Sequence, residues 1–261
     1  MSNTRSSRRI HFLDELRGLC VILMVFYHAF YTIGYIYDVA FCQTLFAFFS
    51  PAEPIFAGIF VFICGLCCNL SHNNLKRGLL LAAVAAVLSL VLWFGIRSNL
   101  LHPSSQIWFG VLHCLAACIL LYVLLRPTIR FIPSWLGIIL CTVLFVLCYH
   151  IPSGEGGYFG IRGLFTLATP SADVNNPFLY AFGLCPVSIA GDYFPLLPWS
   201  FCFLAGSYVG TWHRSFPKWM YRRHIPFFAN LGKWALWIYL AHQPVIYGLC
   251  FLVSFLIQKL Q

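Results

Sequence analysis

Long apolar segments alternate with short polar ones along this chain of 261 residues. Seven of the apolar segments are long enough to form helices that cross a hydrocarbon core of about 30 Å. The pattern therefore predicts an all-α fold, a polytopic transmembrane helical bundle of about seven spans. The predicted spans are Leu19–Tyr37, Pro54–Leu70, Gly78–Ile96, Gln106–Leu125, Trp135–His150, Leu196–Trp212 and Lys233–Leu256.

The longest segment between predicted spans is Ile151–Pro195, which is rich in Gly, Pro and Asn. Within it, Pro177–Ala190 is apolar but short and contains Pro186, so we expect a short re-entrant or interfacial helix there. The segment combines carboxylates, Glu155 and Asp173 among them, with several aromatic residues. This mixture fits either a sugar-binding loop or a lid that packs on the bundle.

Composition supports a membrane protein, because 61% of the residues are hydrophobic and only 9% are charged. A soluble domain of this length does not have such a composition. The first apolar run is too long for the core of a signal peptide, and no small-residue cleavage site follows it. No linker, repeat or low-complexity tract divides the chain, so we expect one integral membrane domain over residues 1–261.

Positive charges predict the orientation. With the N-terminus in the cytoplasm of a cell-membrane protein and the C-terminus outside, 13 of the 16 Lys and Arg residues fall in inner segments. The net charge of +9 then matches anionic lipid at the inner face of the bilayer and needs no nucleic acid. The inner residues are Arg5, Arg8, Arg9, Arg17, Lys76, Arg77, Arg126, Arg130, Arg214, Lys218, Arg222, Arg223 and Lys233.

The twelve cysteines lie mostly inside apolar runs, where a free thiol behaves as a small hydrophobic group. Cys64 and Cys67 form a single C-x-x-C pair. No second pair and no suitably spaced histidine accompanies them, so the sequence predicts neither a disulfide framework nor a metal site.

Three histidines lie within predicted spans. Because a helix rises about 1.5 Å per residue, His28 lies about 16 Å deeper than Arg17, near mid-bilayer. By the same measure His242 lies about 13 Å beyond Lys233, and His113 about 10 Å below the outer surface. An ionisable residue at this depth needs a partner and by default marks a functional site. We therefore expect the three histidines to line one polar cavity, the alternative being that each only packs against a neighbouring helix.

Histidine is suited to acyl transfer, since it can accept a proton from an attacking group or carry the acyl group itself. Few carboxylates are available to orient such a histidine. Asp14 and Glu15 lie at the inner edge, Glu53 near the outer end of the second span, and Asp192 just before the sixth. Channels and proton-coupled transporters usually carry charged residues within their spans, whereas here the mid-span ionisable groups are nearly all histidines.

Four motifs resemble one known family, the transmembrane acyltransferases that include the catalytic domain of heparan-alpha-glucosaminide N-acetyltransferase. Asp14-Glu15-Leu16-Arg17-Gly18, followed by Met24 and His28, resembles the family's opening, and Arg17 and His28 also match the R-x10-H signature of bacterial O-acyltransferases. Phe109-Gly110-Val111-Leu112-His113 resembles F-G-I-L-H. Asp192-Tyr193-Phe194-Pro195-Leu196-Leu197-Pro198-Trp199 resembles D-Y-x-P-L-L-P-W. Leu231 to Pro244 resembles G-x-x-S-L-x-I-Y-L-x-H-Q-P, with Ala235 where serine is usual.

The resemblance implies transfer of an acetyl or other acyl group from cytosolic acyl-CoA to a sugar or glycan acceptor. On this interpretation His28 is the base or acyl carrier, and the catalytic set is His28, His242, His113 and Asp192. The phosphates of the co-substrate are held by Arg17, Lys76 and Arg77, or by the cluster from Arg214 to Arg223. The same residues also fit the excess of positive charge on the cytoplasmic side that sets the orientation of a membrane protein. The predicted acceptor contacts are Glu53, Asp192 and Tyr193.

Two other classes of protein fit the hydropathy pattern. One is a transporter or flippase for a lipid or small solute, which internal repeat symmetry would favour; the sequence shows no such symmetry. The other is a structural or sensory membrane protein without chemistry. The sequence leaves the acceptor, the acyl chain and the oligomeric state open, a homodimer included.

Overall fold

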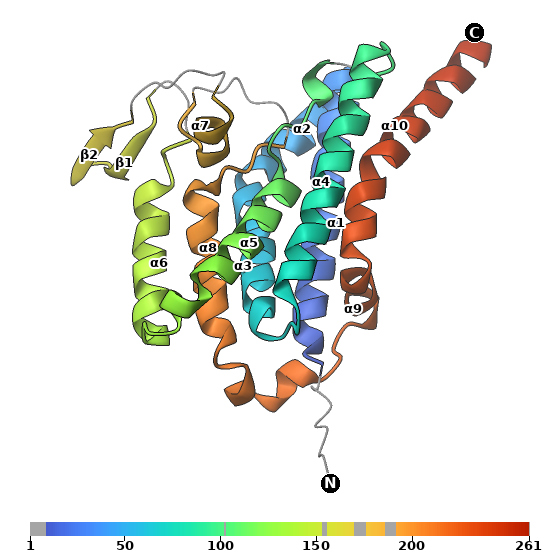
Figure 1. The fold of residues 1–261 in the computed structure, drawn as a ribbon. Helices are drawn as coiled ribbons and strands as arrows, with labels where there is room; N and C mark the ends of the chain where they lie inside the picture. The colour runs from blue at the N-terminus through green and yellow to red at the C-terminus, as the bar shows by residue number, and fades with distance from the viewer. Residues whose placement is uncertain (1–8, 102, 153–155, 170–175, 186–191, 261) are drawn as a thin grey trace. The chain divides into compact units, whose positions relative to one another are not determined.

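The computed structural model describes residues 9–101, 103–152, 156–169, 176–185 and 192–260. These residues form a mostly helical protein with one small hairpin (Figure 1). The chain divides into two compact units, residues 1–60 with 215–261 and residues 61–214. The expectation of one acyltransferase-like domain over the whole chain stays a prediction.

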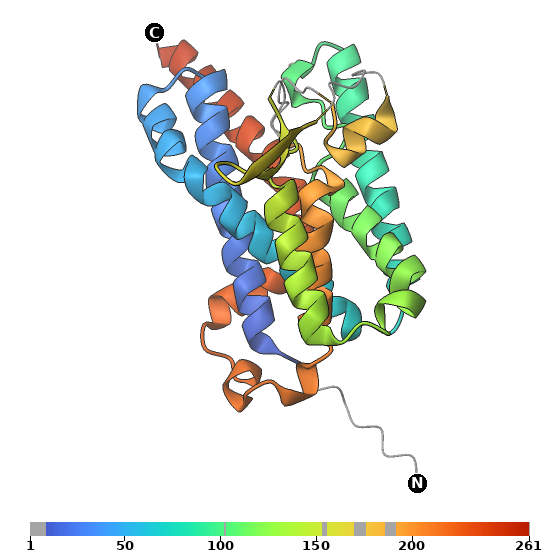
Figure 2. The same cartoon turned by 90° about the vertical axis from the view of Figure 1, so that its left-hand side faces the viewer.

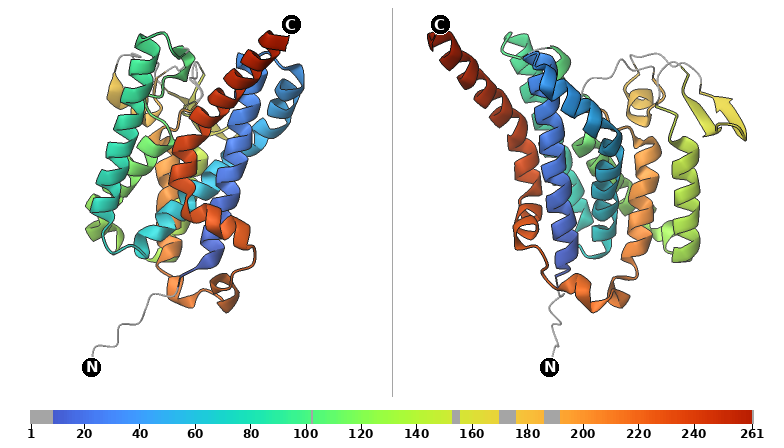
Figure 3. Two further views of the ribbon diagram at one scale, coloured as in Figure 1. Left: turned by 90° about the vertical axis from the view of Figure 1, so that its right-hand side faces the viewer. Right: turned by 180° about the vertical axis from the view of Figure 1, so that it is seen from behind.

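The first unit is built around α1 (His11–Tyr31), which continues into a π-helical turn at Thr32–Ile36. Further along the chain come α2 (Ala40–Phe49), a short 3-10 turn at Ser50–Ala52 and the start of α3 (Glu53–Leu66). After a 3-10 turn at Lys218–Tyr221, the unit ends with α9 (Pro226–Lys233) and α10 (Ala235–Leu260). Figure 3 shows the C-terminal half of α10 diverging from α1.

Two glycines bring α1 and α9 into close backbone contact. A Cβ on Gly18 would clash with the carbonyl of Phe228, and a Cβ on Gly232 would clash with the carbonyl of Asp14. Small residues at facing positions allow membrane helices to approach closely, because lipid offers no hydrophobic drive for helix association. The two glycines therefore hold α9, and the start of α10 that follows it, beside the first helix.

The second unit contains the end of α3, a 3-10 turn at Cys67–Asn69, α4 (Asn74–Arg97), a 3-10 turn at Pro103–Ser105 and α5 (Val111–Ile129). It continues with α6 (Ser134–Cys148), the strands β1 (Tyr158–Ile161) and β2 (Phe165–Ala168), α7 (Pro177–Phe182), α8 (Leu196–Gly210) and a 3-10 turn at His213–Ser215. Helices α6 and α8 run side by side, with the hairpin at the end of α6 (Figure 2). The strands pair in antiparallel register, Tyr158 with Ala168 and Ile161 with Phe165.

Each of the seven predicted spans contains a helix, but it is not confirmed that all seven helices cross the membrane. Within the described residues, five helical segments are long and apolar enough to cross a membrane: His11–Ile36, Ala40–Asn69, Asn74–Arg97, Val111–Ile129 and Ala235–Leu256. The remaining two, Ser134–Cys148 and Leu196–Gly210, have 15 residues each. At 1.5 Å per residue these reach about 22 Å, less than the hydrocarbon thickness.

The apolar surface shows how the chain meets lipid. Helix α4 buries almost none of its apolar residues: Leu79, Leu80 and Val87 are each more than half exposed. In water such a face would be unstable, whereas in a bilayer it contacts acyl chains. The chain is therefore an integral membrane protein.

The segment Ile151–Pro195 contains the expected short helix, which is α7. Asn176 caps that helix by accepting hydrogen bonds from the backbone N–H groups of Phe178 and Leu179, and Gly183 ends it with a φ of 87°. The β1–β2 hairpin was not predicted. Glu155, Asp173 and residues 186–190 of the predicted Pro177–Ala190 element lie outside the described residues.

Candidate functional site

The four motifs meet in two pairs, one pair in each compact unit. In the first unit the opening motif on α1 lies against the motif at residues 231–244 on α9 and α10. Glu15, which is only 6% exposed, accepts hydrogen bonds from the backbone N–H groups of His224 (2.6 Å) and Ile225 (2.9 Å). These two groups precede the first turn of α9, where unpaired N–H groups favour a negative charge. Glu15 therefore attaches the start of α9 to α1.

Arg17 lies one turn beyond the second buried carboxylate, Asp14. Asp14 is 3% exposed and forms ion pairs with Arg9 at 2.6 Å and with Arg17 at 3.2 Å. Two arginines neutralise the aspartate, which allows a carboxylate to remain buried in the first turn of a membrane helix. Arg17 thus has a structural partner in addition to any role toward a ligand.

His28 and His242 lie next to each other, as their matching depths predict. Their ring centroids are 5.1 Å apart. His242 is 8% exposed, and its Nδ1 forms a hydrogen bond with the Tyr239 carbonyl one turn earlier in α10. A carbonyl only accepts, so this bond places a proton on Nδ1; in the neutral ring Nε2 is then the acceptor.

Aromatic and polar neighbours fix this histidine pair. The ring of Tyr27 lies edge-on to His28 with centroids 5.5 Å apart and also contacts Phe46 and Phe56. One turn further along the chain, the fully buried Thr32, which begins the π-helical turn after α1, donates to the Gln243 side-chain oxygen at 3.5 Å. Since Gln243 follows His242 directly, this bond gives α1 and α10 a second polar contact beside the histidines.

In the second unit the motif ending at His113 meets the motif beginning at Asp192. The N–H of Phe194 donates to the Phe109 carbonyl at 3.1 Å. Asp192 Oδ2 lies 2.8 Å from the position that a Cβ on Gly110 would occupy. Gly110 itself donates its N–H to His113 Nδ1 at 3.4 Å. Only glycine leaves room for the carboxylate to approach the backbone here.

A chain of hydrogen bonds fixes the tautomer of His113. Because Nδ1 accepts from Gly110, the ring proton of neutral His113 is on Nε2, which lies 3.3 Å from Ser89 Oγ. Ser89 in turn donates to the Ile107 carbonyl at 2.6 Å. His113 belongs to the other compact unit from the His28–His242 pair. The prediction that all three histidines share one cavity stays a prediction.

The predicted phosphate ligands on α4 differ in their surroundings. Lys76 is exposed in the first turn, where its backbone N–H is capped by Asn73 at 2.8 Å. Arg77 donates through Nη2 to the Cys64 carbonyl at 3.0 Å and lies equally close to the Cys64 sulfur. The guanidinium thus satisfies a carbonyl near the end of α3, a structural role that the sequence does not reveal.

The predicted acceptor contacts are distributed over both units. Glu53 occupies the first turn of α3. Tyr193 donates its hydroxyl to the Tyr180 carbonyl at 2.6 Å, and the two rings are 4.8 Å apart. Burial disfavours the phenolate and raises the pKa of Tyr193 and of Tyr180. Tyr193 therefore joins α7 to the segment before α8.

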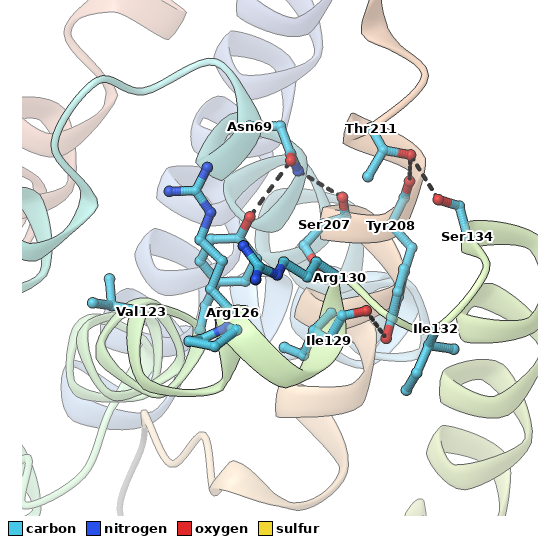
Figure 4. Close-up of a pocket in the computed structure, with 12 residues that line it drawn as sticks. Asn69, Val123, Arg126, Ile129, Arg130, Ile132, Ser134, Ser207, Tyr208 and Thr211 are labelled. Carbon is cyan, nitrogen blue, oxygen red and sulfur yellow. Dashed lines mark hydrogen bonds between the residues drawn. The ribbon is translucent and has the colours of Figure 1, made fainter.

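The second unit also contains a pocket of about 590 Å³ that the sequence does not predict. Asn69, the end of α5, the residues before α6 and the end of α8 line it, and the side chains of Arg126 and Arg130 extend toward Asn69 (Figure 4). Asn69 donates to the Ser207 carbonyl at 2.6 Å and accepts from the Tyr122 hydroxyl at 3.4 Å. One wall of the pocket is thus a fixed network of hydrogen bonds.

The fold and the paired histidines define a helical integral membrane protein with a polar site inside its apolar bundle. The family described as "Heparan-alpha-glucosaminide N-acetyltransferase, catalytic" matches residues 9–244, a range that includes all four motifs. The chain belongs to this family and is a membrane acyltransferase. Comparisons with curated proteins and with solved structures give no match.

Proposed function

We propose that this protein moves an acetyl group from cytosolic acyl-CoA to a sugar-type acceptor, with the His28–His242 pair as the reactive centre. The observation that carries the proposal is the 5.1 Å separation of the two rings, one on α1 and one on α10. Each ring lies in a motif that resembles the acyltransferase family, and a family match over residues 9–244 supports the reaction class.

The pair can perform the proton transfers that the reaction needs. An acceptor hydroxyl or amine that attacks the thioester carbonyl loses a proton, and a neutral imidazole nitrogen accepts it. The CoA thiolate that leaves takes a proton back as the thiol. Because the Nδ1 proton of His242 is directed at the Tyr239 carbonyl, Nε2 is the acceptor nitrogen of the neutral ring, and it serves as the base or as the partner of His28.

Two routes through this centre are chemically balanced. In direct transfer, His28 removes the proton while the acceptor attacks the thioester. In the covalent route, a His28 nitrogen attacks first, CoA thiol departs, and the acceptor then takes the acetyl group from an acetyl-imidazole. The covalent route gives ping-pong kinetics, and direct transfer does not.

The other predicted residues supply binding in this proposal. Arg17, Lys76 and Arg77 face the phosphates of the co-substrate from the cytosolic side. Glu53, Asp192 and Tyr193 contact the acceptor, and Asp192 orients His113 across Gly110. The chain lies in the cell membrane with the N-terminus in the cytoplasm and the C-terminus outside.

The test uses the purified protein in neutral-lipid nanodiscs with acetyl-CoA labelled in the acetyl group. We expect release of CoA thiol that depends on an amino sugar or glycan acceptor and is matched by label in that acceptor. Varying both substrates separates the two routes, since parallel double-reciprocal plots indicate the acetyl-histidine. Absence of transfer to any sugar acceptor, together with lipid or solute movement across proteoliposomes, would instead establish a transporter or flippase.

A further inference from the structure

We propose that the pocket beside Arg126 and Arg130 is a binding site for an organic phosphate. Within the proposed function, the ligand of this chemistry is the phosphorylated adenosine end of a CoA thioester, and the pocket is then an alternative to the phosphate contacts at Arg17, Lys76 and Arg77. The head group of an anionic phospholipid carries the same chemistry.

The pocket carries two positive charges close together. Arg126 and Arg130 lie four residues apart, one helical turn, at the end of α5, so their like charges repel each other. The chain contains no Asp or Glu from residue 54 to residue 154 or from residue 193 onward, and these two stretches supply every described residue that lines the pocket. Among the described lining residues no carboxylate therefore neutralises the pair, and a bound phosphate would relieve the repulsion.

The geometry of the pair also suits phosphate. Guanidinium groups hold phosphate through two parallel hydrogen bonds, and two arginines one turn apart can hold two phosphate groups or grip a single one from two sides. Ser134, in the first turn of α6, also lines the pocket. The backbone N–H groups of a first helical turn favour an anion. Its hydroxyl is 2.9 Å from that of Thr211.

The size and lining of the pocket indicate the kind of ligand. A volume of about 590 Å³ lies within the range of small-molecule sites and far exceeds a single inorganic phosphate. Val123, Pro127 and Ile132 give part of the lining an apolar character. A ligand that combines phosphate with a flat or apolar portion therefore fits better than a free ion.

The position of the pocket also fits a phosphate ligand. Asn69 follows α3, Arg126 and Arg130 end α5, Ser134 begins α6 and Thr211 follows α8. The charge pattern of the sequence assigns all four of these helix ends to the cytoplasmic side. The pocket thus opens where cytosolic CoA and the anionic inner leaflet both supply phosphate.

The experiment measures coenzyme A and adenosine 3′,5′-bisphosphate binding by calorimetry to the full chain in phosphatidylcholine nanodiscs. The test variant is Arg126→Gln with Arg130→Gln. The matched control is Arg97→Gln, which removes an exposed arginine that does not line the pocket, at the C-terminal end of α4. Loss of two charge-assisted phosphate contacts should weaken binding by at least about tenfold, and the control should not change it. The double substitution Arg126→Lys with Arg130→Lys, which keeps the charge without the bidentate geometry, should be intermediate.

A second arm separates the sources of phosphate. Here the thermal stabilisation of the protein by phosphatidylglycerol in the nanodiscs is compared for the same variants. If the Gln variant loses only this stabilisation, the site binds a lipid head group; if it loses only nucleotide affinity, the site binds CoA. If neither differs from the control, the proposal is overturned.

The failure of the site and the failure of the proposed function give different results. CoA binding by the wild type without acetyl transfer would refute the proposed function alone. Acetyl transfer with unchanged CoA affinity in the Gln variant would refute a CoA site alone.

Discussion

Replacing Glu15 tests whether its carboxylate attaches the start of α9 to the first helix and so stabilises the protein. The carboxylate accepts two backbone hydrogen bonds, at 2.6 and 2.9 Å, from a largely buried position. A hydrogen bond to a charged group contributes about 1.5–3 kcal/mol, against about 1 kcal/mol for a neutral pair. Glu15→Gln keeps an acceptor and loses the charge, so we expect a cost of about 2 kcal/mol. Glu15→Ala removes both bonds and should cost about 3–4 kcal/mol. The cost should not be larger, because His224 and Ile225 are exposed and water can accept the hydrogen bonds of their backbone N–H groups.

The assay is reversible unfolding in mixed micelles, with SDS titrated against a non-ionic detergent. Asp38→Asn is the matched control, because Asp38 accepts from Gln43 at 3.0 Å on the exposed surface. A surface change of this kind should stay within about 0.5 kcal/mol. If Glu15→Gln is as stable as Asp38→Asn, the attachment of α9 through this carboxylate contributes nothing, and the reasoning is refuted.

Two further changes probe the second unit. Gly206→Ala should destabilise the protein by about 1–3 kcal/mol in the same assay, because the new methyl group would meet the Phe62 carbonyl, whereas Gly248→Ala, with open space around it, should be neutral. Tyr193→Phe should cost about 1 kcal/mol at neutral pH through the lost bond to the Tyr180 carbonyl. Burial raises the pKa of Tyr193, so the wild type's advantage should be constant below about pH 10 and shrink above it as the unfolded chain ionises; an advantage that grows in that alkaline range would contradict this.

Hydropathy and depth predict much of the first unit. His28 and His242 were expected to meet because each lies a similar number of residues from a basic helix end, and a rise of about 1.5 Å per residue turns that spacing into depth. Helix α1 begins at His11, before the predicted span Leu19–Tyr37, because Arg9 and Arg17 neutralise Asp14 and so allow a charged first turn to remain helical. Helix α2 was missed, since Pro51 interrupts its continuation into α3.

The pocket could not be predicted from sequence. Asn69, Arg126 and Thr211 are far apart in the chain, and their contact depends on how helices pack, which hydropathy does not encode. Arg126 and Arg130 were visible only as part of the positive-inside signal. The hairpin also has a physical explanation: its four-residue strands are too short for a clear alternation, and Gly163, with a positive φ, is the local signal that marks its turn.

The most direct test of the account is the rate of acetyl transfer by the His28→Ala variant, measured with labelled acetyl-CoA and a sugar acceptor. His72→Ala, which removes an exposed histidine, is the control. We expect His28→Ala to lose about 10²–10⁴-fold in rate, the contribution of a positioned proton acceptor, with an unchanged melting temperature; the control should keep the wild-type rate. A folded His28→Ala protein that transfers acetyl at the wild-type rate would contradict this expectation.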